Sequence, residues 1–389
     1  MKKGMDIIMK KGLFIVLFGL CCLLSMRVMT VSAQAEEKNQ YTFVPNQKGT
    51  GYELQKFDPF VIVIDTEEAD YEVKDYDYYA SLIANSTDET KAIVPDTYKG
   101  KPVTSIGDNA FFGCIYLETI ELPKSIERIG DLAFSGCQSL KAINIPNKLT
   151  YLGKAAFNEC NALETIVLPN SLKRIEDTTF NCCVALKEVT LPNKLKSIGL
   201  AAFEKCESLT EIKLPQSVTS LGNNVFQDCS SLTAISLPSK IKKIPNLAFS
   251  GCSALKKVLI PKTVNKIGSA AFANCDALKE VIIPIGVTVL ESKTFSGCYS
   301  LESVELPSKL TTIGDSCFNF CESLTSLTIP ETVMSIGKDA IKSCTYLTWV
   351  ELCGQPKKVD KSNYGLDKGK GIYSRTWQEA EKGKKFKKG

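Results

Sequence analysis

The chain has 389 residues, with 47 lysine and arginine residues against 43 aspartate and glutamate residues, and it contains no histidine. Without histidine it cannot form a Ser-His-Asp or Cys-His catalytic site, a histidine metal site or a histidine pH switch. Residues 1–35 hold five of the positive charges and one of the negative charges, so residues 36–389 are formally neutral. Net charge therefore gives no reason to expect nucleic acid as a partner.

The first 35 residues have the organisation of a secretory signal peptide. Lys10 and Lys11 precede an apolar run over residues 13–26, and the small-x-small pattern of residues 33–35 follows. The apolar run is shorter than the ~20 residues that a membrane-spanning helix needs. We expect residues 1–35 to be a Sec-type signal, leaving a mature chain without a transmembrane segment that is secreted or attached to the cell surface. A membrane anchor is the alternative.

Residues 36–94 precede a long repetitive region and lack its pattern. They include an apolar run, residues 60–64, and an acidic, tyrosine-rich stretch, residues 65–79. The open apolar edge of a stack of repeats needs a cap, so we expect capping as the role of this segment. A cation site is the alternative, but the acidic residues lack the spacing of an EF-hand.

A strict 23-residue period runs through residues 95–354. Phenylalanine recurs from Phe111 to Phe318, cysteine from Cys114 to Cys344 and proline from Pro123 to Pro330. One unit, residues 117–137, reads Leu-x-x-Ile-x-Leu-Pro-x-x-Ile-x-x-Ile-Gly-x-x-Ala-Phe-x-x-Cys. This period lies within the 20–29 residues of leucine-rich repeats.

The pattern predicts an α/β leucine-rich-repeat solenoid of about eleven 23-residue coils. The alternation of polar and apolar residues before each proline predicts a half-buried strand, and these strands would align into a parallel sheet on one face. The Ala-Phe-x-x-Cys segment predicts short helical turns on the opposite face, and non-repeat caps would close both ends. Glu176, Pro245 and Glu291 occupy the slot that Gly130 fills in its coil, so glycine there is a preference of packing or turn shape.

The cysteines form a ladder rather than a disulfide framework. Eleven of the 16 occupy one slot in successive coils, where parallel side chains keep Cβ atoms about 4.8 Å apart, beyond the ~3.5–4.5 Å of a disulfide. A linear ladder does not converge on a zinc ion either. We expect buried free thiols that act as small hydrophobes. Cys182 is the candidate exposed thiol, Cys317 should be buried, and Cys353 is ambiguous.

These motifs resemble the BspA-like, Treponema-type class of leucine-rich repeats, over residues 95–352. Five residue types keep phase together across eleven coils, which makes the resemblance specific. It implies the solenoid fold and, more weakly, a bacterial surface or secreted protein; some members are adhesins for host matrix proteins or other microbes. The family supplies no catalytic residues.

The side chains that flank each inward strand isoleucine should form an exposed and mostly polar face. Leu259 and Ile282 should be neighbours one coil apart, with lysines beside them, which suggests a contact patch; isolated exposed apolar residues are the alternative. The candidate protein-binding patch comprises Lys256, Lys257, Leu259, Lys279, Glu280 and Ile282.

Residues 355–389 form a basic C-terminal tail, in which 11 lysine and arginine residues from position 357 onward face four acidic residues. We expect a solvated tail; retention on an anionic cell wall is the alternative.

Taken together, these features predict an exported protein that binds a protein or glycan on host or microbial surfaces through the sheet face. A rigid envelope-associated spacer without a specific ligand is the alternative. We expect no enzymatic activity and no cofactor or metal site, because the serine, threonine and lysine residues form no constellation beyond the repeat.

Overall fold

The computed structural model describes residues 41–46, 52–57, 90–363, 371–374, 385 and 387–388. Every described residue belongs to one compact unit of the chain. The expected signal peptide, the acidic tyrosine-rich stretch and much of the basic tail lie outside the described residues. Within the described residues, no helix is long and apolar enough to cross a membrane.

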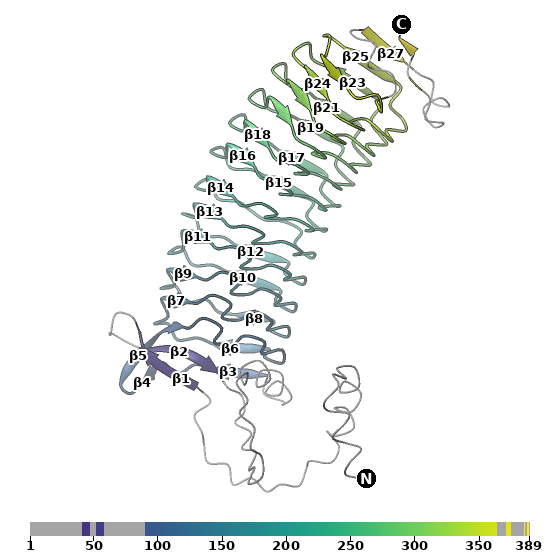
Figure 1. Cartoon of the computed structure of the whole chain (residues 1–389). Helices are drawn as coiled ribbons and strands as arrows, with labels where there is room; N and C mark the ends of the chain where they lie inside the picture. The colour runs from purple at the N-terminus through teal and green to yellow at the C-terminus, as the bar shows by residue number, and fades with distance from the viewer. Residues whose placement is uncertain are drawn as a thin grey trace, which may run out of the picture. The chain divides into compact units, whose positions relative to one another are not determined.

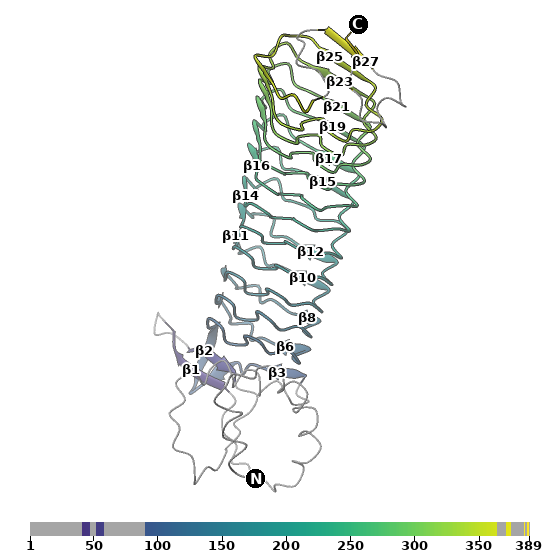
Figure 2. The ribbon, with the colours of Figure 1, turned by 45° about the vertical axis from the view of Figure 1, so that its right-hand side comes forward.

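Residues 90–363 form a stack of coils in which each turn of the chain lies on the turn before it (Figures 1 and 2). Short strands line up into two rows, and each coil contributes one strand to each row, except that the coil around Ile212 has a strand in the second row alone. The first row contains β3 (Lys91–Ile93), β6 (Thr119–Glu121), β8 (Ala142–Ile143), β10 (Thr165–Val167), β12 (Glu188–Thr190), β15 (Ala234–Ser236), β17 (Lys257–Leu259), β19 (Glu280–Ile282), β21 (Ser303–Glu305), β23 (Ser326–Ile329) and β25 (Trp349–Leu352). The second row contains β5 (Lys101–Ile106), β7 (Arg128–Ile129), β9 (Tyr151–Leu152), β11 (Arg174–Ile175), β13 (Ser197–Ile198), β14 (Ser220–Leu221), β16 (Lys243–Ile244), β18 (Lys266–Ile267), β20 (Val289–Leu290), β22 (Thr312–Ile313), β24 (Ser335–Ile336) and β26 (Lys358–Val359).

The strands within each row are parallel, and neighbouring strands that pair do so in a register of one repeat. Thr165 lies opposite Glu188 in the first row, and Arg174 lies opposite Ser197 in the second. The fold is therefore a parallel β-solenoid with a 23-residue repeat, as the period predicts. The second row lies in the stretch of each coil that corresponds to residues 126–129, where the sequence indicates a turn of the coil with room for a second short strand.

The core is a column of phenylalanine rings. All ten repeated phenylalanines, from Phe111 to Phe318, have no exposed surface. Successive rings are stacked, with centroids 5.0 Å apart at the first pair and 5.7 Å apart at the last. Fully burying one such side chain contributes roughly 1.5–3 kcal/mol, so the column is a large part of the stability.

The cysteine ladder runs beside this column as buried free thiols, as expected. From Cys137 onward, each ladder thiol donates to the carbonyl of the phenylalanine one coil earlier: Cys137 Sγ lies 3.1 Å from the oxygen of Phe111, and Cys252 Sγ lies 3.1 Å from the oxygen of Phe226. The same bond recurs up to Cys344. Each thiol thus fills a small apolar space and also satisfies a buried carbonyl, which explains why one residue type can hold the slot throughout.

The expected short helical turns are not found among the described residues, and the backbone hydrogen bonds show why. In the Ala-Phe-x-x-Cys segment, the amides of Leu132, Phe134 and Gly136 each donate to a carbonyl of the next coil, at 2.8 Å. Leu132 and Gly136 also adopt the left-handed conformation, with φ of 57° and 76°. An α-helix needs these amides for its own carbonyls and excludes positive φ, so the segment forms consecutive tight turns instead.

The slot of Gly130 controls how closely two coils approach in the second row. A Cβ atom at Gly199 would lie 2.6 Å from the nitrogen of Asp177, and one at Gly222 would collide with the backbone of the preceding coil. The glycine amide uses this closeness to donate to the earlier coil, as Gly222 does to Ile198 at 2.9 Å. Close packing between coils therefore explains the preference for glycine. The sequence had left both packing and turn shape as explanations.

The second row is interrupted or weakened where a larger residue fills this slot. At Glu176 the row breaks between β9 and β11, and at Pro245 it breaks between β14 and β16. At Glu291 only Ile267 and Leu290 remain paired between β18 and β20. In all three coils the slot holds a residue with a Cβ atom, which does not fit against the preceding coil as closely as glycine does, and proline also lacks the amide. Asp360 in the last coil is an exception, since its amide still donates to Ile336.

Both ends of the stack carry additional strands. At the N-terminal end, β1 (Tyr41–Pro45) pairs antiparallel with β2 (Tyr52–Phe57), β2 pairs parallel with β5, and β4 (Thr97–Tyr98) pairs antiparallel with β5. At the C-terminal end, β27 (Gly371–Ser374) pairs antiparallel with β25, and β28 (Lys387–Lys388) pairs with β27. The expectation of a solvated tail is thus wrong for β27, because Tyr373 packs into the core with no exposed surface.

Candidate binding surface

The first row presents the exposed face that the alternation predicts. In β6, β10, β17 and β19 the central residue is buried and both flanking residues are exposed. The inward centres are isoleucine or valine in most coils, such as Ile166 and Val258, while the outward positions change from coil to coil. The repeat therefore fixes the inside of this row and leaves the outside free to vary.

The structure places the predicted apolar pair on this face, in equivalent positions of neighbouring coils. Leu259 is 56% exposed at the end of β17, and Ile282 is 65% exposed at the end of β19. The two strands lie next to each other in the stack (Figure 1). They belong to two separate sheets, one formed by β15 and β17 and the other by β19 and β21, and do not pair with each other. The two side chains therefore lie on either side of a seam in the row.

The charged residues of the predicted patch have different environments. Lys256, Lys257 and Glu280 are exposed. Lys279 is held by an ion pair, in which its Nζ lies 3.0 Å from Glu302 Oε1 of the next coil. Both members of this pair are more than half exposed, so solvent screens it and it orients the lysine more than it stabilises the fold.

Val167 and Ile93 share the outward register position of Leu259 and Ile282, with exposed fractions of 65% and 53%. Val167 also lines a hollow of about 360 Å³ at the seam between β8 and β10, together with Asn144 and Thr165. The sequence-based patch omitted both residues. Alternation in the sequence places Val167 on the exposed face, and extending the same alignment to residues 91–93 would have added Ile93.

Aromatic side chains at the turns were also missed. Tyr299 and Phe320 are each 44% exposed, with ring centroids 6.5 Å apart. Phe320 has a φ of 60°, in a slot that Gly297 fills one coil earlier. A bulky residue is disfavoured in this conformation. The signal in the sequence was an aromatic residue at a position that glycine, cysteine or a polar residue occupies in the other coils.

The cysteines outside the ladder have distinct environments. Cys182 is half-buried in a left-handed turn, and burial, as the largest effect, raises the pKa of its thiol, which favours the less reactive protonated form. Cys317 is fully buried, and Cys353 is half-buried. Among the residues that the structure describes, no group of cysteine and carboxylate side chains has an arrangement that could hold a metal ion.

Comparison with known proteins agrees with this geometry. The family model of the BspA-type leucine-rich-repeat region matches in overlapping segments, at residues 104–233, 173–300 and 224–348. A search of curated proteins finds no match.

Solved bacterial structures are similar to this chain. A leucine-rich-repeat protein from Bacteroides ovatus is 26% identical, with a TM-score of 0.57, covering 85% of this chain and 92% of that one. A leucine-rich cell surface protein from Faecalibacterium prausnitzii is 25% identical, with a TM-score of 0.47 and coverages of 84% and 97%. The pneumococcal vaccine antigen PcpA is 21% identical, with a TM-score of 0.52 and coverages of 82% and 81%. The family match spans well over half of the chain, and the chain therefore belongs to the BspA-type leucine-rich-repeat family.

Proposed function

We propose that this protein acts at or outside the cell surface and binds a protein or glycan of a host or microbial surface. The observation that carries the proposal is the contrast within the first row, where inward residues repeat and outward residues do not. The basic, apolar and small-residue order of residues 1–35 supports export. Membership of a family that is often surface-associated supports the location.

The proposed contact surface centres on Leu259 and Ile282, with Lys256 and Lys257 beside them. Two apolar side chains that are more than half exposed lose solvent contact when a partner covers them. The adjacent lysines give the contact a charge preference without burying an ion pair. An extended row of such weak contacts suits a large partner better than a small molecule.

Binding of the purified chain to immobilised matrix proteins, glycans and cell wall tests the proposal. We expect saturable binding to one partner, and weaker binding after the combined change Lys257→Gln, Leu259→Ser and Ile282→Ser. The matched control is Lys124→Gln, Ile285→Ser and Met334→Ser, which alters three exposed residues of the same kinds outside this surface. If no partner binds saturably, the protein is better explained as a rigid spacer.

A further inference from the structure

A second surface with a distinct character lies on the second row. We call it the lysine face, and it consists of residues 193–200, 216–223, 239–246 and 262–269 of four successive coils. These segments contain no acidic residue, no arginine and no aromatic residue. Its lysines are Lys194, Lys196, Lys240, Lys242, Lys243, Lys262 and Lys266.

The fold holds these lysines outward. Ile241 and Ile244 point into the core and have no exposed surface, so Lys240, Lys242 and Lys243 around them are exposed. The placement repeats in neighbouring coils, since Lys243 lies opposite Lys266 in the paired strands β16 and β18. Like charges directly opposite one another destabilise a sheet, so this arrangement is unfavourable for the fold alone.

The charges of the lysine face are mostly unbalanced. Within the described residues, the only ion pair made by its lysines joins Lys266 Nζ to Glu291 Oε1, at 3.9 Å. The first row differs, because there Lys141 and Lys187 each pair with a glutamate of the preceding coil, at 2.8 and 2.9 Å. The repeat can therefore pair lysines across coils, and the lysine face lacks the acidic partners to do so.

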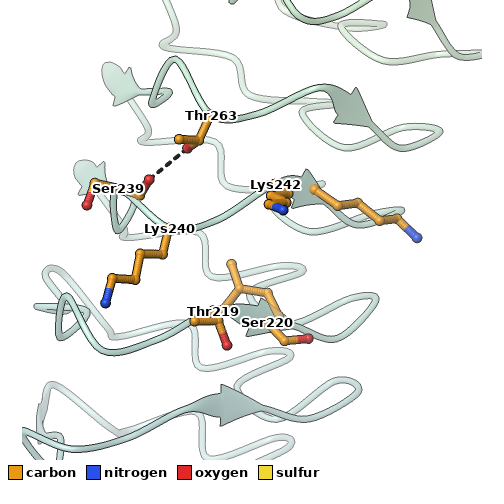
Figure 3. Close-up of a pocket in the computed structure, with 8 residues that line it drawn as sticks. Thr219, Ser220, Ser239, Lys240, Lys242 and Thr263 are labelled. Carbon is orange, nitrogen blue, oxygen red and sulfur yellow. Dashed lines mark hydrogen bonds between the residues drawn. The ribbon is translucent and has the colours of Figure 1, made fainter.

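The lysine face also has a hollow, at the unpaired seam between β14 and β16, and Pro245 directly follows β16. The hollow has a volume of about 570 Å³. Figure 3 shows Lys240 and Lys242 on one coil, Thr219 and Ser220 on the coil before it, and Thr263 on the coil after it. The Thr263 hydroxyl donates to the Ser239 carbonyl at 2.8 Å, which ties two of these coils together.

From this geometry we infer that the lysine face binds a sulfated polysaccharide, with its sulfate groups along the row of lysines and one segment in the hollow. Four coils at the usual strand spacing span roughly 15 Å, so a linear chain along the stack would meet cations on several coils. The hydroxyl groups that line the hollow can bond to sugar hydroxyls. This inference goes beyond the proposed function, because it concerns the other row and a defined ligand class.

The residues of the lysine face favour this ligand over other polyanions. Single-stranded nucleic acid is usually bound through aromatic side chains that stack on bases, and this face has none. Arginine forms bidentate pairs with phosphate and carboxylate groups, and it is absent too. Lysines act as point charges, which suits singly charged sulfate groups spaced along a chain.

Binding of the full chain to immobilised heparin tests the inference, with desulfated heparin and single-stranded DNA as comparison ligands. We expect saturable binding to heparin that weakens as ionic strength rises, since exposed charges are screened by salt. The combined change Lys240→Gln, Lys242→Gln and Lys243→Gln should weaken it about tenfold, as expected for the loss of three exposed charge pairs.

The matched control is Lys124→Gln, Lys148→Gln and Lys309→Gln, which removes the same charge from exposed second-row loops outside the lysine face. Heparin affinity within twofold of the unmodified chain in this control would support the inference. Equal weakening by both triple variants would overturn it. The inference would also be overturned if the chain did not bind heparin, or if it bound desulfated heparin or single-stranded DNA as tightly as heparin. None of these results would change the binding expected through the first-row surface, so the experiment can refute this inference without refuting the proposed function.

Discussion

Raising the pH should unfold this protein through its buried thiols. Burial raises the pKa of nine ladder thiols, and for Cys298 it does so to about 12. The nine are Cys137, Cys160, Cys183, Cys206, Cys229, Cys252, Cys275, Cys298 and Cys321. Because the folded pKa lies above the unfolded value, their contribution to stability is fully present below the unfolded pKa and is lost as pH rises toward the folded one.

The size of this effect follows from the unfolded pKa alone. A free cysteine has a pKa of about 8.5, so at about pH 9.5 the unfolded chain gains roughly 1.4 kcal/mol for each thiol that the fold keeps protonated. Nine such thiols give roughly 13 kcal/mol, which is comparable to the whole stability of a typical domain. We expect the midpoint of urea unfolding, followed by circular dichroism under reducing conditions, to fall sharply between neutral pH and about pH 9.5.

Removing thiols separates this effect from the titration of other groups. The combined change Cys206→Ala, Cys229→Ala and Cys252→Ala should reduce the pH-dependent loss by about a third, while lowering stability at neutral pH through small cavities. Ser253→Ala, next to a ladder thiol, should leave the pH dependence unchanged. If the triple variant lost stability with pH as steeply as the unmodified chain, the buried thiols would not be the cause.

Three further predictions concern packing and thiol exposure. Gly222→Ala should lower the free energy of unfolding by roughly 2–4 kcal/mol, because the new Cβ atom crowds the preceding coil and the hydrogen bond of the amide is lost. Gly286→Ala should change it by under about 1 kcal/mol, because its Cβ would meet neighbouring atoms at 3.2 Å or more. Urea unfolding compares the two variants, and equal losses would contradict the proposed role of the slot that Gly222 occupies. Phe226→Ala should cost about 3–5 kcal/mol by opening a cavity between two stacked rings, measured in the same way; a loss under about 1 kcal/mol would refute this. In the folded protein a thiol reagent should label Cys182 and Cys353 but not the ladder, as mass spectrometry of peptides would show; labelled Cys252 would contradict its burial.

The sequence predicts the structure of each coil well because the side chains that recur every 23 residues are the ones that the fold buries. Phe111 to Phe318 recur at fixed spacing since each ring packs on the next, and Ile166 alternates with exposed neighbours since only one side of its strand faces the core. The turn segment was assigned wrongly because its spacing of apolar residues suits a helix. Its amides bond to the next coil, and a pattern within one repeat does not contain that information.

The candidate surfaces were predictable in part. The outward positions of Leu259 and Ile282 follow from alternation, but the seam between their strands depends on hydrogen bonds between coils. The hollow at Pro245 likewise depends on how a missing glycine separates two coils. The sequence showed that proline replaces glycine at position 245. It did not show that a hollow lies next to this position in a lysine-rich surface, because that depends on where Thr219 and Thr263 lie in the neighbouring coils.

The most direct test of the proposed function is binding of the full chain to immobilised host and microbial surface components, with the first-row variant and its control in parallel. We predict saturable binding to one protein or glycan that is weakened by changing Lys257, Leu259 and Ile282 together and is retained when Lys124, Ile285 and Met334 are changed. Equal binding by both variants, or no saturable binding to any component, would contradict recognition through the first row.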